Sequence, residues 1–241
     1  MKKDVNEEFM KIYAVKNLDI NKEKLCELLS LFIDKEKRYK IEKFINKEDK
    51  IRTLIGEILV RVIINENLGI TNNHITFEKN KYGKPCLKNY ENFNFNISHS
   101  GDFVACVIDD KPVGIDIEKI KHIEYEDIAK SFFTINEYEY IIKNDSYTPL
   151  SKFYKIWTLK ESYIKCCGQG LSIPLKSFSI DIDKNKSIKM LNDNNHNGYI
   201  FKSFDIDLHY KMAVCSLTKR ISRDTIMIDQ NSLINRYLDL I

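Results

Sequence analysis

The sequence GIDIEKI, residues 114–120, lies near the middle of the 241-residue chain and places two carboxylates inside an apolar run. Side chains of a strand alternate between its two faces, so the isoleucines point to one side and Asp116 and Glu118 to the other. These carboxylates then project side by side, about 7 Å apart along the strand. They repel each other unless a cation lies between them, although the polar face of an edge strand is the simpler alternative. Gly114 has no side chain and therefore permits a close approach, for example by a ligand.

Hydrophobic periodicity and breaker residues predict the elements around this strand. Helices are expected at 22–46, at 48–67 with an end near Gly69, at 124–143 and at 151–167. A turn is expected at 80–87, two strands within 93–109 around a loop at Ser98–Asp102, and further strands at 112–118, 177–182, 199–206 and 211–217. The mixture of separate helices and strands predicts an α+β protein.

The chain also contains a weak internal repeat. GEILVR (56–61) aligns with KESYIK (160–165), which pairs Glu57 with Glu161, and each helix is followed by a Phe-x-Ile strand, a loop and a strand that contains Ala and Cys. The identity is thin, so chance remains an alternative. The common order predicts two similar α+β halves related by a pseudo-two-fold.

The two halves would be residues 1–111 and 112–241, joined near residues 110–118. At 43% hydrophobic residues, the chain can bury a proper core. Its 38 basic and 35 acidic residues give a net charge of only +3, which argues against a nucleic-acid partner.

Cysteine usage and hydropathy indicate the compartment. None of the six cysteines forms a CxxC pair, so a zinc site is not expected, and free thiols suit a reducing cytoplasm. The N-terminus MKKDVNEEFM lacks the apolar core of a signal peptide, and no run approaches the roughly 18 apolar residues of a membrane span. We therefore expect a cytoplasmic protein without a membrane partner.

A second constellation is WTLKESYIK, residues 157–165. On a helix, Trp157, Glu161 and Lys165 are successive i, i+4 positions and share one stripe. Glu161 and Lys165 could form an ordinary surface ion pair. The only tryptophan of the chain lies on the same stripe, which favours the wall of a cleft.

Three further segments carry groups suited to anions. NISHSGD (96–102) could be a plain loop or a cradle in which hydroxyls, an imidazole and backbone N–H groups donate to phosphate. In YGKPCL, Lys84 lies between Gly and Pro, so its ammonium should be held out of a stiff turn. KEKRYKIEK (35–43) is a basic cluster on a helix, for which a solvated face is the simpler interpretation.

Together these segments supply three acidic groups and several basic ones, which suits a phosphate ester bound through a divalent metal. Oxygen ligands without a His or Cys cluster favour Mg²⁺ or Mn²⁺ over zinc.

At these motifs the sequence resembles the 4′-phosphopantetheinyl transferases, of the larger surfactin-synthetase-activating type. The family pattern Gly-(Ile/Val)-Asp-(Ile/Val)-Glu corresponds to residues 114–118, and after about forty residues Trp/Phe-x-x-Lys-Glu-Ser/Ala-x-x-Lys corresponds to 157–165. YGKPCL, FNISHSGD, FFTINEY (132–138) and KMAVCSL (211–217) are also similar to family motifs, in the same order. The resemblance covers roughly residues 10–230.

The resemblance implies transfer of the phosphopantetheine arm of coenzyme A to a serine of an apo acyl or peptidyl carrier protein, with release of 3′,5′-ADP. It implies a monomeric pseudo-dimer, with coenzyme A in the cleft between a nucleotide-gripping first half and a metal-holding second half. Asp116, Glu118 and Glu161 would hold Mg²⁺ against the pyrophosphate, and Lys165 would reach the same phosphates. The remaining contacts with coenzyme A would come from Lys37, Lys40, Arg52, Lys84, Ser98 and His99.

The chemistry of the residues leaves alternatives. Glu161 is the nearest plausible base for the incoming serine, and it could be base, metal ligand or both. A metal-dependent phosphodiesterase or nuclease also uses acidic clusters, but it normally needs two metals and more acidic ligands. A carrier-binding module without activity is a third alternative, which the intact acidic trio disfavours. The sequence does not choose among fatty-acid, polyketide and nonribosomal-peptide carriers, and we expect the carrier to dock near residues 119–150.

Overall fold

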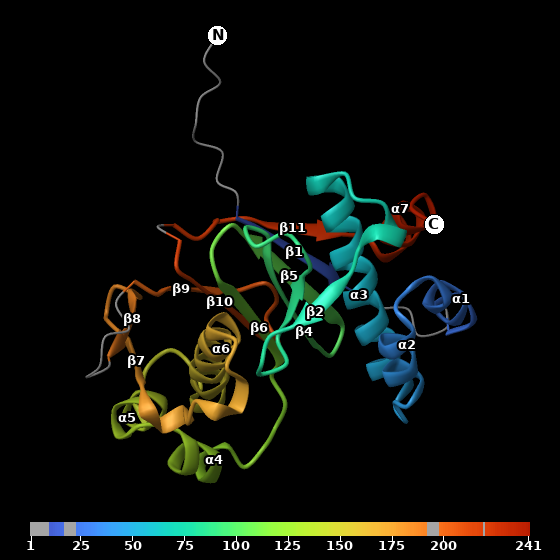
Figure 1. Cartoon of the computed structure of the whole chain (residues 1–241). Coiled ribbons are helices and arrows are strands. Elements are labelled where there is room, and N and C mark those ends of the chain that lie inside the picture. The colour runs from blue at the N-terminus through green and yellow to red at the C-terminus, as the bar shows by residue number, and fades with distance from the viewer. Residues whose placement is uncertain (1–9, 17–22, 192–197, 219) are drawn as a thin grey trace.

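The computed structural model describes residues 10–16, 23–191, 198–218 and 220–241 and has the expected α+β class (Figure 1). Its helices are α1 Glu23–Leu29, α2 Lys35–Glu42, α3 Lys47–Leu68, α4 Tyr125–Phe132, α5 Ile135–Ile142, α6 Pro149–Cys167 and α7 Gln230–Leu238, with short 3₁₀ turns η2 Ser30–Phe32, η3 Asn72–His74, η4 Gly170–Ser172 and η5 Leu175–Ser177. Its strands are β1 Lys11–Lys16, β2 Phe77–Lys79, β3 Pro85–Leu87, β4 Asn94–Ser100, β5 Phe103–Asp109, β6 Val113–Lys119, β7 Ser179–Ile182, β8 Ile188–Leu191, β9 Ile200–Phe204, β10 Tyr210–Ser216 and β11 Thr225–Ile228.

Two sheets form the centre of the molecule. The first has the strand order β11-β1-β5-β4 and packs against α3, and the second has the order β6-β10-β9 and packs against α6 (Figure 1). One apolar cluster fills the space between the sheets, with Ile12 and Val107 from the first and Ile115, Ile117 and Val214 from the second, all fully buried. The expectation that the isoleucines of GIDIEKI hold a core is therefore confirmed.

The two long helices begin and end as their sequences predict. Asn46 caps α3, and Gly69 ends it in the left-handed region at φ 69°. Thr148 caps α6, whose first residue is Pro149. A side chain at Gly114 would lie 2.1 Å from the carbonyl oxygen of Ser162, so this glycine admits the backbone of α6 rather than a ligand.

The expected continuous helix at 22–46 is wrong in its middle, and residue 22 lies outside the described residues. The chain is helical in α1 and α2 but extended at Ile33. The carbonyl of Phe32 accepts hydrogen bonds from the side chains of Asn72 and Tyr237, which are distant in sequence. Asp34 pairs with the buried Arg61 of α3, at 2.5 Å. These long-range contacts break the helix, and local periodicity does not contain them.

The expected helix at 124–143 is also two helices, because Thr134 starts a new one. Its hydroxyl accepts the N–H of Glu137, and the Glu137 carboxylate accepts the N–H of Thr134. This reciprocal capping box matches the sequence Thr-x-x-Glu, so the break had a sequence signal. The carboxylate of Glu137 also pairs with the fully buried Lys160 of α6 and so fixes α5 to that helix.

The elements not expected from the sequence include β1, β2, β8, β11 and α7, and β3 occupies the end of the expected turn at 80–87. β11 pairs in parallel with β1, and α7 packs on α3 beside the first sheet (Figure 1). The end of the chain therefore returns to the first half. A cut at residue 111 would assign β11 and α7 to 112–241, although they pack with β1 and α3 of 1–111.

The proposed pseudo-two-fold remains a prediction. In its favour, α3 lies on β4 and β5 much as α6 lies on β6 and β10. Glu57 is buried and bonds the guanidinium of Arg61 at 2.7 Å, and Lys37 lies 3.7 Å from its other oxygen. Glu57 is thus bound to basic neighbours.

Candidate active site

The carboxylate of Asp116 is the centre of the site. It is 3% exposed, on the face of β6 opposite the core isoleucines. Its Oδ1 accepts a hydrogen bond from the ammonium of Lys165 at 2.6 Å and from the hydroxyl of Ser98 at 3.0 Å. The α6 stripe and the β6 strand, two motifs separated by about 40 residues in the sequence, therefore meet as predicted.

Glu118 and Glu161 complete a concentration of negative charge. Burial, then the negative charges of Asp116 and Glu161, raise the pKa of Glu118 to about 7, while Ser100 and Lys165 oppose the shift. Burial and then Asp116 raise the pKa of Glu161, and Lys165 again opposes the shift. Three carboxylates thus share one desolvated region that lacks sufficient positive charge.

A ladder of polar side chains joins β4 to β6 and holds the carboxylates in place. Asn96, Ser98 and Ser100 alternate along β4 and accept hydrogen bonds from three backbone N–H groups of β6, those of Ile115, Ile117 and Lys119. The hydroxyl of Ser100 also donates to Glu118, at 2.8 Å. Sequence reasoning did not select Asn96 or Ser100, although polar residues at every second position of a strand were a visible signal.

The donor set fits a hard divalent cation. Within the described residues, no three His, Cys, Asp or Glu side chains are arranged to hold a metal ion, and Lys165 supplies the positive charge beside Asp116. Oδ2 of Asp116, however, is buried and has no hydrogen-bond partner among the described residues. A buried carboxylate oxygen without a donor requires compensation, and Mg²⁺ commonly takes one or two carboxylates together with substrate phosphates.

Two adjoining cavities connect this centre with the first half. One, of about 280 Å³, is lined by Glu161 and Lys165, and the other, of about 400 Å³, by Lys37 and Lys40. They meet at the start of β3, where Gly83 and Pro85 line both. The expected reaction centre and two expected nucleotide contacts therefore lie along one continuous surface.

Three lysines that line the larger of these cavities are paired with carboxylates. Lys37 lies 3.7 Å from Glu57, and Lys40 bonds Glu36 at 2.6 Å. Lys79, which sequence reasoning did not select, bonds the same carboxylate of Glu36 at 2.9 Å. The pairs of Lys40 and Lys79 with Glu36 are exposed and therefore weak, so an entering anion can take these ammonium groups.

The ammonium of Lys84 does not extend out of its turn, which corrects the expectation from YGKPCL. It donates to the carbonyl oxygens of Val113 at 2.9 Å and Lys165 at 2.7 Å, and to that of Cys166 at 3.3 Å. Burial lowers the pKa of Lys84. Its charge thus lies at the carboxyl end of α6, where a cation is favoured by the helix dipole.

Ser98 and His99 do not form the expected loop cradle, because both belong to β4 and the turn is confined to residues 101–102. As neighbours on a strand they face opposite sides. Ser98 faces the carboxylates, whereas His99 lies near Arg52 of α3. Desolvation, then the cations Arg52 and Lys165, lower the pKa of His99, so its imidazole is neutral at pH 7. The guanidinium of Arg52 is held by Asp49 at 2.6 Å.

Trp157 continues the stripe of Glu161 and Lys165 but has a different role from theirs. Its ring packs near Phe153 and Phe133, with centroid separations of 5.9 and 6.2 Å. It therefore anchors α6 to the apolar cluster of the second half rather than forming a wall of the cleft.

Comparisons with known proteins identify relatives of this chain. The family model "4′-phosphopantetheinyl transferase, N-terminal" matches residues 21–110, and the model of the 4′-phosphopantetheinyl transferase superfamily matches residues 112–215. The chain is 39% identical to 4′-phosphopantetheinyl transferase Sfp of Bacillus subtilis, over 93% of this chain and 100% of that protein. It is 37% identical to 4′-phosphopantetheinyl transferase gsp of Aneurinibacillus migulanus, over 88% of each. A crystal structure of a holo-(acyl-carrier-protein) synthase from Bacillus anthracis in complex with coenzyme A aligns with a TM-score of 0.39 and 16% identity, covering 44% of this chain and 93% of that one.

The chain therefore belongs to the 4′-phosphopantetheinyl transferase superfamily. Its match to Sfp over the whole length of that relative confirms the larger type that the sequence motifs indicated.

Proposed function

We propose that this enzyme uses Mg²⁺ to transfer the phosphopantetheine arm of coenzyme A to a serine of an apo acyl or peptidyl carrier protein. The observation that carries the proposal is the convergence of Asp116, Glu118 and Glu161 beside Lys165, with one buried carboxylate oxygen that has no donor. That centre adjoins the cavity that Lys37 and Lys40 line. An acidic metal site beside a basic groove suits a pyrophosphate substrate.

Asp116, Glu118 and Glu161 would hold the metal. Bound Mg²⁺ would neutralise charge on the pyrophosphate oxygens during the reaction. The ammonium of Lys165 would then leave Asp116 and pair with a phosphate oxygen. It can do so because its side chain is 28% exposed and lies at the mouth of the site. Ser98 and Ser100 would keep the carboxylates oriented through their hydrogen bonds.

The first half would hold the nucleotide. Lys37 and Lys40 are placed to meet its phosphates, and the neutral imidazole of His99 and the guanidinium of Arg52 lie on the adjoining side of β4. We propose that Lys84 stabilises the carboxyl end of α6 instead of contacting coenzyme A, since its ammonium already donates to three carbonyl oxygens.

In the reaction, the serine oxygen of the carrier would form a bond to the phosphorus that bears the pantetheine arm. The bond from that phosphorus to the bridging pyrophosphate oxygen would break, and 3′,5′-ADP would leave. Glu161 would accept the serine proton, a task that its raised pKa favours.

The carrier would dock on the second half, near residues 119–150. Of the two phenylalanines there, Phe133 is buried and Phe132 is 50% exposed at the end of α4. Ile135, at the start of α5, is 77% exposed. Exposed apolar side chains of this kind suit a transient protein contact. We further propose a monomer in the cytoplasm that serves carriers of nonribosomal-peptide or polyketide synthesis.

The decisive experiment incubates the purified enzyme with coenzyme A, Mg²⁺ and an apo carrier, and measures the intact mass of the carrier. A transferase adds one phosphopantetheine, and a control carrier with Ala in place of the acceptor serine gains nothing. EDTA should abolish the reaction and Mg²⁺ should restore it. Cleavage of coenzyme A without a gain in carrier mass would indicate a phosphodiesterase instead.

A further inference from the structure

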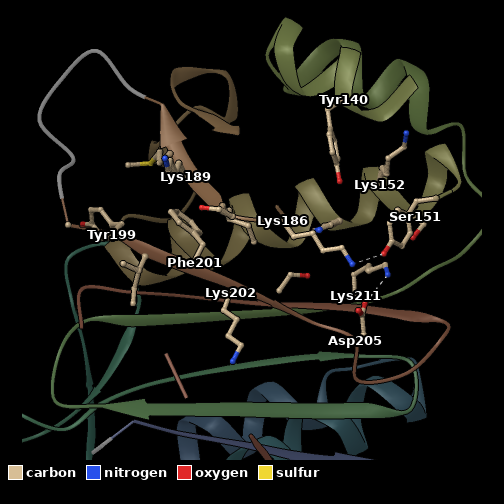
Figure 2. Close-up of a pocket in the computed structure, with 18 residues that line it drawn as sticks. Tyr140, Ser151, Lys152, Lys186, Lys189, Tyr199, Phe201, Lys202, Asp205 and Lys211 are labelled. Carbon is tan, nitrogen blue, oxygen red and sulfur yellow. Dashed lines mark hydrogen bonds and ion pairs between the residues drawn. The ribbon is translucent and has the colours of Figure 1, made fainter. Parts of the chain in front are cut away.

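A larger cavity, of about 660 Å³, lies beside α6 (Figure 2). It is bounded by α5 and the first turns of α6 on one side and by β8, β9 and the start of β10 on the other. It shares no lining residue with the two cavities of the candidate active site. Tyr140 and Tyr147 of its lining belong to the range proposed for carrier docking, but none of the expected coenzyme A or metal residues lines it.

The lining of this cavity is strongly basic: among the described residues that line it are six lysines and one carboxylate, that of Asp205. Two of these lysines are committed elsewhere. Lys152 donates to the carbonyl of Lys143 and pairs with Asp145, and Lys202 donates to the carbonyl of Ser222. The charge available to a ligand therefore comes from the other four.

Three of those four ammonium groups come together at one end of the cavity. Lys155 projects from α6, Lys211 from β10 and Lys186 from the turn before β8, and Figure 2 shows Lys186 and Lys211 reaching into the same region. Lys211 has a side chain only 12% exposed and pairs with Asp205 at 3.3 Å. Lys155 is half-buried, and no carboxylate among the described residues lies within ion-pair distance of it. Burial lowers the pKa of Lys155. The nearby carboxylate of Asp205 opposes this shift, and the positive charges of Lys211 and Lys186 add to it.

Hydroxyl donors surround the same end. Tyr140 directs its hydroxyl into the cavity (Figure 2), and burial raises its pKa to about 12, so it stays protonated. Tyr147 bonds the ammonium of Lys186 at 3.3 Å, and Ser151 lines the cavity at the amino end of α6. Phosphate oxygens are typically bound by ammonium and hydroxyl groups, and this concavity presents both.

We propose that this cavity is a second anion site, distinct from the coenzyme A cleft, that binds a small phosphorylated metabolite. A volume of several hundred Å³ is typical of small-molecule sites. A phosphate carries close to two negative charges and three acceptor oxygens, which matches three ammonium groups with a single carboxylate among them. The acidic surface of a folded partner fits less well, because Lys155 and Lys211 are half-buried in the concavity.

The test uses the full chain saturated with coenzyme A, so that the cleft is occupied, and inorganic tripolyphosphate as the probe. Isothermal titration calorimetry should detect binding to the unaltered enzyme. The double variant Lys155→Met Lys186→Met should bind at least about tenfold more weakly, as expected for the loss of two charge-assisted contacts. The matched control Lys111→Met Lys176→Met removes the same charge from exposed positions outside the cavity and should bind tripolyphosphate like the unaltered enzyme.

Two further readouts separate this site from other roles of the lysines. Without anions the cavity variant should unfold at no lower temperature than the unaltered enzyme, because it has lost mutually repelling charges. Its transfer rate and its KM for the carrier should be unchanged in anion-free buffer. Equal tripolyphosphate affinity in the two double variants, a lower melting temperature of the cavity variant, or a raised carrier KM with tripolyphosphate binding intact would each overturn the proposal.

Discussion

Replacement of Lys165 by Met should destabilise the metal-free enzyme, because it leaves the buried carboxylate of Asp116 without its cation. In the structure the ammonium lies 2.6 Å from Oδ1 of Asp116, whose side chain is 4% exposed, while Oδ2 has no hydrogen-bond partner among the described residues. Ser98 would then be the remaining side-chain donor to Oδ1 among those residues.

The expected magnitude follows from burial. Removal of one partner of a buried ion pair costs about 3–5 kcal/mol. Lys165 is 28% exposed, so water can take part of its place, and we expect a loss of about 2–3 kcal/mol in the free energy of unfolding. For a protein of this size that corresponds to a melting temperature lower by roughly 4–12 °C.

The assay is thermal unfolding at pH 7.5 in EDTA, followed by a titration with Mg²⁺. The variant should gain more stability from Mg²⁺ than the unaltered enzyme, because the metal no longer competes with an ammonium for Asp116. The double variant Asp116→Asn Lys165→Met should recover most of the loss. Lys130→Met serves as a control, because it breaks an exposed pair with Glu126 and should cost less than about 1 kcal/mol.

If the melting temperature of Lys165→Met in EDTA stayed within about 1 °C of that of the unaltered enzyme, the buried ion pair would not exist in solution. A loss of stability that Mg²⁺ relieved equally in both proteins would instead show that the metal does not bind at Asp116.

Three other outcomes are expected. Asp116→Ala and Glu161→Ala should each lower the transfer rate by a factor on the order of 10³ or more in the carrier-mass assay, since a hard ligand is lost; near-normal turnover at ordinary Mg²⁺ would refute the metal assignment. Lys84→Met should lower the free energy of urea unfolding by about 1–3 kcal/mol, because buried carbonyls lose their donor, and an unchanged urea midpoint would contradict this role. Burial raises the pKa of Asp109 from 3.8 to about 6, so the folded state binds the proton more tightly and stability falls as the pH rises through that range. Asp109→Asn should therefore be more stable than the unaltered enzyme above pH 6 by at most about 3 kcal/mol, with no advantage near pH 4, and a melting-temperature difference independent of pH would exclude this cause.

Much of the reaction centre could be predicted from the sequence, because its two motifs are local patterns on regular elements. Alternation along GIDIE placed the isoleucines in the core and both carboxylates on the other face, and helical spacing placed Glu161 and Lys165 on one stripe. The boundaries of α3 and α6 were also readable, since capping residues act within a turn of the helix. That β6 and α6 meet was inferred from the chemistry they share and from the family resemblance.

Other features depended on contacts between residues far apart in the chain. The break near Ile33 arises from hydrogen bonds to Phe32 that Asn72 and Tyr237 donate, and the destination of the Lys84 ammonium is set by the end of α6. The return of β11 to β1 likewise has no local signal, because strand pairing is a matter of backbone groups that every sequence carries.

The sequence by itself determined the type of each long element and the chemical identity of the reacting groups, because both follow from side chains within a few residues of one another. Only the tertiary structure decided with which oppositely charged group each charged side chain pairs. Lys165 could have pointed to solvent, to Glu161 or to Asp116, and the close approach of α6 to β6 over Gly114 selects Asp116. The physical reason is that electrostatic energy depends on distance and desolvation, which are properties of the packed chain rather than of the sequence.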